Sequence, residues 1–187
     1  MDLYHITLFV HIIVLVVAGS AATVVKLSLG RLKRARTVGE ALEWHNVVSA
    51  TSKLFPICLA VFVISGAYML SLAQTAWSAG FVIAGLTGVA FLLVSGVFLG
   101  VKGKVAGQAL EAMAKENENQ PAPKVVPPRL VRMLPAINTA VALSVAFDMV
   151  TKPESAGVAL TVVAIGFLIG VAASMRVPAP AREKIEA

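Results

Sequence analysis

Five long stretches of the chain consist almost entirely of apolar residues. The first, residues 3–25, contains no Asp, Glu, Lys or Arg. At a helical rise of ~1.5 Å per residue it would extend roughly 34 Å, enough to cross a hydrocarbon core of ~30 Å. The five predicted spans are residues 3–25, 54–73, 80–101, 130–150 and 155–175. The pattern therefore predicts an all-α fold, an integral membrane bundle of five transmembrane helices.

The segments between the spans add one further helix. Thr37 and Glu40 have the S/T-x-x-E spacing of a capping box, which marks a helix start. The less polar residues that follow repeat at helical spacing, and Trp44 is of a type that favours the membrane–water interface. We expect a short amphipathic helix on the membrane surface that leads into the second span. Residues 103–129 are expected to form a cytoplasmic linker: a helical extension into water over residues 102–119, then a proline-rich segment over residues 120–128.

Composition supports the membrane assignment, and the chain length leaves no room for a separate soluble domain. The chain has 187 residues, of which 58% are hydrophobic and 14% charged, whereas soluble domains carry about 25% charged residues. We therefore expect one transmembrane domain over residues 1–187, with the lipid bilayer as its main partner. The net charge of +6 does not indicate a nucleic-acid partner, because the basic residues flank apolar spans and no nucleic-acid motif is present.

The distribution of these basic residues predicts the orientation. All of the Lys and Arg except Lys152 lie in the loop after the first span, in the linker after the third, at the start of the fourth span (Arg132) or beyond the fifth span. Under the positive-inside rule the N-terminus is outside and the C-terminus and linker are cytoplasmic. The expected location is the bacterial inner membrane, crossed several times.

Few ionisable or metal-ligating groups lie inside the spans, and each is a functional candidate because burying it is costly. If the first, second and fourth spans are neighbours, their outer ends would bring five such residues together: His5, His11, Met69, Asp148 and Met149. The candidate cofactor-binding residues are His11, Met69 and Met149. The candidate metal ligands are His5, His11 and Asp148.

Helix geometry limits how these residues can be used. His5 and His11 are separated by ~9 Å along one helix and by ~120° around it, so they cannot share one ion. His45 is predicted at the opposite membrane face. Haem ligation by His11 with Met69 or Met149, haem shared across a dimer, and a Cu(I) site all remain open. A histidine that only hydrogen-bonds a neighbouring helix is the alternative, and on that reading no cofactor is bound.

Several short motifs together resemble the copper-resistance protein D superfamily of bacterial membrane proteins. They are Leu8-Phe-Val-His11, the Gly-Ser-Ala run at 19–21, the basic loop, the segment Ser65-Gly66-Ala67-Tyr68-Met69-Leu70 and the turn Met149-Val-Thr-Lys152-Pro153. This resemblance implies copper handling. The small membrane protoporphyrinogen oxidase, which binds haem b, is similar in having a histidine in its first span, and that analogy implies His11 as the ligand.

Two hypotheses of function follow. The first is a haem b or copper site near His11 with a redox or metal-handling role. The second is a non-catalytic accessory or scaffold subunit of a larger membrane complex, respiratory or photosynthetic, or a homo-oligomer. Its helices would pack through glycine faces such as Gly96-x-x-x-Gly100 and Gly166-x-x-x-Gly170. No hydrolase triad, Walker loop, Rossmann fingerprint, HExxH or CxxC motif is present, so the sequence does not indicate a soluble-type enzyme.

Overall fold

The computed structural model describes residues 2–124 and 127–175, and its six regular elements in those ranges are all α-helices. They are α1 (Leu3–Leu32), α2 (Val38–Ser52), α3 (Leu54–Leu72), α4 (Gly80–Asn117), α5 (Arg129–Thr151) and α6 (Ala156–Met175). The C-terminus, which the sequence places in the cytoplasm, lies outside the described residues.

Five helical segments of the described chain are long and apolar enough to cross a membrane, as predicted. Three of them are longer than a bilayer requires: α1 has 30 residues, α2 and α3 together cover 35, and α4 has 38. At ~1.5 Å per residue these three extend roughly 45 to 57 Å. Within the predicted linker 103–129 the expected helical extension is present, because α4 continues as a helix to Asn117. Residues 125–126 lie outside the described ranges.

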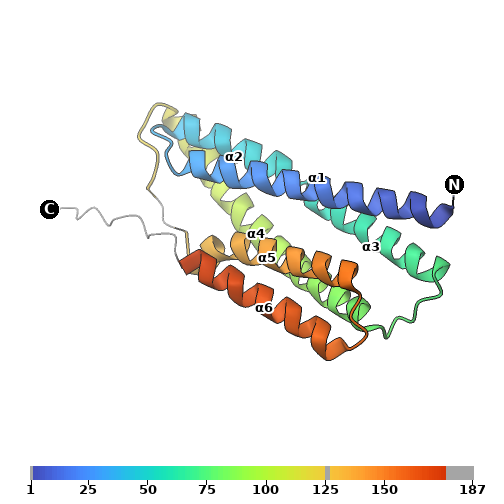
Figure 1. Cartoon of the computed structure of the whole chain (residues 1–187). Coiled ribbons are helices and arrows are strands. Elements are labelled where there is room, and N and C mark those ends of the chain that lie inside the picture. The colour runs from blue at the N-terminus through green and yellow to red at the C-terminus, as the bar shows by residue number, and fades with distance from the viewer. Residues whose placement is uncertain (1, 125–126, 176–187) are drawn as a thin grey trace.

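The helices form two groups that meet along α4. In one group α1 packs against α2 and α3, and in the other α4, α5 and α6 pack against one another. Both α2 and α3 also contact α4, which joins the two groups (Figure 1). The spans that follow one another as α4, α5 and α6 are thus neighbours, while α1 takes the α2–α3 segment as its partner.

The helix before the second span begins where the capping box predicts, but its expected position on the membrane surface is wrong. The Thr37 hydroxyl accepts a hydrogen bond from the backbone N–H of Glu40 at 3.2 Å. From there α2 packs lengthwise along α1 and runs through Lys53 directly into α3 (Figure 1). The reason is that α1 is long enough to pack against both segments, so burial against α1 keeps α2 in line with α3.

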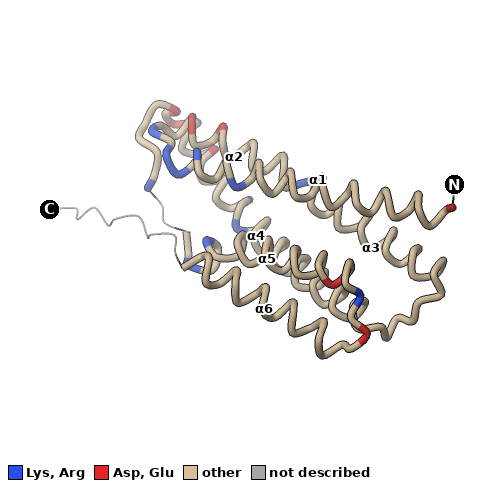
Figure 2. Tube along the Cα trace, in the orientation of Figure 1, with Lys and Arg blue, Asp and Glu red and all other residues tan. Residues whose placement is uncertain are grey.

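Charged residues gather at the end of the bundle where α1 ends and α2 begins (Figure 2). The pairing of the helices explains this gathering. His11 of α1 contacts Ser65 of α3, and a side chain added at Gly88 of α4 would meet Val145 of α5. These antiparallel registers bring the charged ends of the spans to one side. The basic residues nearest the apolar segments are Lys26, Lys53, Lys102, Arg129 and Arg132.

Beyond these basic residues α1, α2 and the second half of α4 continue as a packed projection. Val38 at the start of α2 is fully buried. Its backbone N–H donates to the carbonyl of Gln120 at 3.0 Å, and the N–H of Gly39 donates to the carbonyl of Glu118 at 2.9 Å. The segment after α4 is therefore fastened to the start of α2.

The core of the second group is a stripe along α5. Its buried residues are Leu134, Ile137, Val141, Val145 and Asp148. Their spacing of three and four residues repeats like a coiled-coil seam, so all five lie on one face of the helix. Four of the five are apolar, and the exception is a carboxylic acid.

The two GxxxG motifs have different surroundings. A side chain at Gly170 would meet the backbone of Ile137 on α5, and one at Gly166 would meet Ser144 and the carbonyl of Ala140. At Gly96 and Gly100 nothing lies within 4 Å. The motif on α6 is thus used inside the chain, and the motif on α4 is open.

Candidate functional site

His11 is held at the contact between α1 and α3. Its Nδ1 lies 2.8 Å from the hydroxyl oxygen of Ser65. That hydroxyl lies 2.7 Å from the carbonyl of Val61 and 3.1 Å from that of Phe62, so its single proton is donated to its own helix. The Ser65 oxygen is therefore left as an acceptor, and we assign the proton of His11 to Nδ1.

The rest of the imidazole is fixed by packing. The ring stacks on Phe62 with centroids 3.9 Å apart and an interplanar angle of 29°. On α3 the next residue after Ser65 is Gly66, where an added Cβ would lie 3.5 Å from Cε1 of the ring. Within the described residues Nε2 has no hydrogen-bond partner. A neutral imidazole oriented through Nδ1–H with a free Nε2 is the arrangement that metal-ligating histidines adopt.

The structure does not assemble the five-residue cluster predicted at the outer ends of the spans. Asp148 and Met149 lie on α5, which packs against α4 and α6 and not lengthwise against α1. Met149 contacts Gly85 of α4. The prediction assumed that the first, second and fourth spans are neighbours, and it is wrong because α1 pairs with α2 and α3.

His5 is also separate from His11. Its side chain is 71% exposed, and its Nδ1 lies 3.8 Å from a carboxylate oxygen of Asp2. Met69 is the one predicted partner on the same pair of helices as His11. It lies on α3 one turn beyond Ser65, and it is half-buried.

The histidine at the other end of the bundle is independent of this site. His45 lies on α2 and its imidazole packs against Gly107 of α4. It belongs to the packed projection, at the other end of the bundle from His11.

A complete metal shell of conventional ligands is not present in the described part of the chain, where no three His, Cys, Asp or Glu side chains lie together. Nε2 of His11 is the nitrogen that could ligate a haem iron or, together with a Met thioether, Cu(I).

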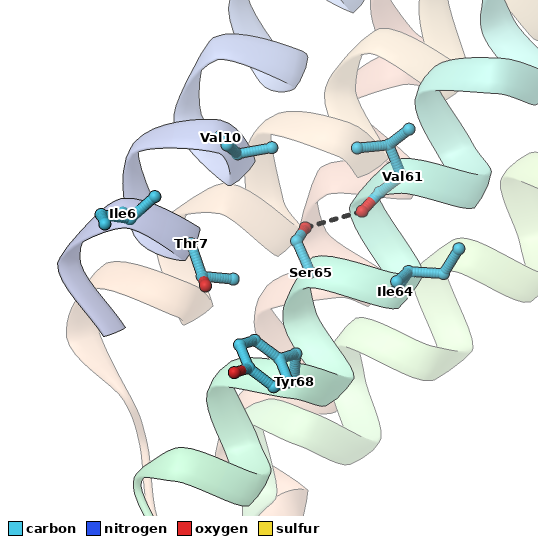
Figure 3. A pocket seen from close by; sticks show the side chains of 7 residues that line it. All are labelled: Ile6, Thr7, Val10, Val61, Ile64, Ser65 and Tyr68. Carbon is cyan, nitrogen blue, oxygen red and sulfur yellow. Dashed lines mark hydrogen bonds between the residues drawn. The ribbon is translucent and has the colours of Figure 1, made fainter. Parts of the chain in front are cut away.

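A shallow groove follows the same helix contact (Figure 3). Its volume is about 250 Å³, and it is lined by Ile6, Thr7, Val10, Val61, Ile64, Ser65 and Tyr68. Figure 3 shows Ser65 at the centre of the lining, between Val61 and Tyr68, with its hydrogen bond to the Val61 carbonyl. The groove is almost wholly apolar, as expected for a surface that faces hydrocarbon.

Two residues at this site were not selected from the sequence. Ser65 orients His11, and Phe62 stacks on it. A hydroxyl in the middle of an apolar span was the available signal for Ser65, because such a group must find a partner inside the bundle. Phe62 carried no signal, since phenylalanine is an ordinary residue in a membrane helix.

Asp148 has an unexpected environment. The sequence placed it about two residues from the end of its span, yet its side chain is fully buried. Neither carboxyl oxygen has a hydrogen-bond partner within the described residues.

The fold and these contacts define a multi-pass helical membrane protein with a polar pair between its first and third helices. No protein-family model, curated protein or solved structure matches the chain.

Proposed function

We propose that this protein binds haem b or copper through Nε2 of His11 and has a redox or metal-handling role in the membrane. The observation that carries this proposal is the 2.8 Å contact between Nδ1 of His11 and Ser65, which leaves Nε2 as the free ligand atom. Phe62 limits the rotation of the ring. A haem or copper ion bound here would supply one-electron chemistry.

A second ligand would come from Met69 or from another chain. Met69 lies on α3 one turn beyond Ser65, and its thioether suits haem iron or Cu(I). Met149 is not part of this site because it packs against Gly85 in the other helix group. His11 and Ser65 also belong to two of the short segments that resemble the copper-resistance protein D superfamily, and this resemblance supports the proposal.

The proposal is tested by the cofactor content of purified protein. Protein made in haem-replete and copper-replete cells should show a Soret band or bound copper in a stoichiometric amount. His11→Ala should abolish that signal, and His45→Ala should leave it intact because His45 lies in the projection. A wild-type protein with neither cofactor would contradict the redox proposal. If His45→Ala and not His11→Ala abolished the signal, the cofactor site would be at His45.

We further propose that the N-terminus faces outward across the bacterial inner membrane, because the basic end of the bundle favours the cytoplasm. An impermeant thiol reagent applied to intact cells should label Ser78→Cys, which lies in the exposed turn before α4. It should not label Glu116→Cys at the exposed end of α4, and the buried native Cys58 should stay unreactive in both variants. Labelling of Glu116→Cys alone would reverse the orientation.

An accessory or scaffold subunit is the second candidate function. The specific observation in its favour is the open glycine face of α4, where Gly96 and Gly100 contact nothing within the described residues. Small residues at this spacing allow another helix to approach closely. This function becomes the better one if purified protein contains neither haem nor copper.

A further inference from the structure

Asp148 is the described chain's clearest departure from the rule that buried polar groups find partners. Its side chain has 0% exposure, and both of its carboxyl oxygens lack a hydrogen bond within the described residues. It occupies the last position of the buried stripe on α5, where the four preceding positions are apolar.

Within the described residues Asp148 forms no ion pair that would compensate an ionised carboxylate. The part of α4 within the span, residues 80–101, and all of α6 contain no Lys, Arg, His, Asp or Glu. On and beside α5 the nearest charged groups are Lys152 and Glu154 in the turn, and both side chains are exposed. The contact between Lys152 and Asp148 is made by backbone atoms, at 2.8 Å from the N–H of Lys152 to the carbonyl of Asp148.

An uncompensated charge in this environment costs several kcal/mol, and a bound proton removes it. One carboxylate and one hydronium ion from the aqueous phase give one carboxylic acid and one water molecule.

A tight turn follows Asp148 and closes onto the start of α4. The turn at residues 152–155 begins at Lys152, whose φ of 47° is left-handed, one helical turn beyond Asp148. It lies on the first residue of α4, where the N–H of Gly80 donates to the carbonyl of Glu154 at 3.1 Å. A Cβ at Gly80 would lie 2.6 to 2.7 Å from backbone atoms of Pro153, Glu154 and Ser155. Only glycine lets the turn close this far onto α4.

We propose that Asp148 is a proton-binding site: its carboxyl group carries a proton at neutral pH and exchanges it with the aqueous phase when the 152–155 turn lifts from Gly80. This site is on a different helix pair from His11, so its test is independent of the haem or copper proposal.

Infrared spectroscopy of the full-length protein tests the protonation state directly. Wild-type protein at pH 7 should show the carbonyl stretch of a protonated carboxylic acid. The band should disappear in Asp148→Asn and persist in Glu154→Gln, which removes an exposed carboxylate. If Asp148→Asn does not fold, Asp148→Val restores an apolar stripe and serves the same purpose. A wild-type protein without the band holds an ionised carboxylate and overturns the proposal.

The proposed route of proton exchange is tested with separate variants. Transfer into D₂O should shift the band slowly in wild-type protein. Gly80→Ala should accelerate that shift about tenfold, because the added methyl group collides with the turn's backbone. Gly96→Ala is the matched control on the same helix, since nothing lies within 4 Å of that position. If Gly80→Ala does not fold, Pro153→Gly loosens the same turn. Equal exchange rates in the turn variant and the wild type would overturn the proposed route.

Discussion

Gly170→Val is expected to destabilise the bundle by about 3 kcal/mol and to separate α6 from α5. An added Cβ at Gly170 would lie 2.5 Å from the Cα of Ile137 and 3.1 Å from the carbonyl of Ala136. These are backbone atoms, so no rotamer change can make room, and α6 must move as a whole. Chemical unfolding of the purified protein in detergent, followed by the loss of helical signal, measures the effect.

Gly100→Val is the matched control for this prediction. It makes the same substitution in the other GxxxG motif, where nothing lies within 4 Å. We expect its unfolding midpoint to stay close to that of the wild type. Equal destabilisation by the two variants would mean that helix propensity, and not the contact between α5 and α6, determines the result.

Ser65→Ala is expected to weaken haem or copper binding by about 10- to 100-fold without abolishing it. The substitution removes the acceptor that holds Nδ1–H of His11, while Phe62 still stacks on the ring. The ring then loses its fixed orientation and Nε2 becomes a poorer ligand. Titration of cofactor-free protein with haem or Cu(I), followed by absorbance or competition with a chelator, gives the change in Kd.

Ser71→Ala provides the comparison on the same helix. The Ser71 hydroxyl is exposed and bonds only the carbonyl of Tyr68. Its removal should leave the Kd unchanged. If Ser65→Ala binds as tightly as the wild type while His11→Ala does not bind, the histidine is the ligand but its hydrogen bond to Ser65 has no part in positioning it.

The number and class of the helices could be predicted because lipid imposes a length and excludes charge. The pairing of helices could not. A span such as α1 is apolar on every side, so its sequence contains no stripe that identifies the face toward α3. The predicted cluster around His11 depended on that pairing. In the structure its members lie in two separate helix groups, because α1 packs against α2 and α3 and not against α5.

Asp148 shows a different reason for error. Counting residues to the end of its span placed it at the interface, but depth along a helix axis does not determine which side the residue faces. The repeat of Leu134, Ile137, Val141 and Val145 predicts that the next position inward is 148, so the pattern was present in the sequence. The two GxxxG motifs show a case in which the pattern does not decide. They have the same spacing, but Gly166 packs against α5 while nothing lies within 4 Å of Gly96.

The length of the projection determines which molecules can reach it. Helix α2 has 15 residues, which corresponds to roughly 22 Å beyond the level of Lys53. The headgroup layer on one side of a bilayer is only about 5 to 8 Å thick. If Lys53 marks the edge of the hydrocarbon core, the tip formed by the start of α2 and the segment after α4 would stand clear of the lipid, and proteins in the aqueous phase could touch it without contacting the membrane. Because α2 continues into α3 with Lys53 as the single residue between them, a change in the tilt of α3 within the bilayer would displace that tip sideways.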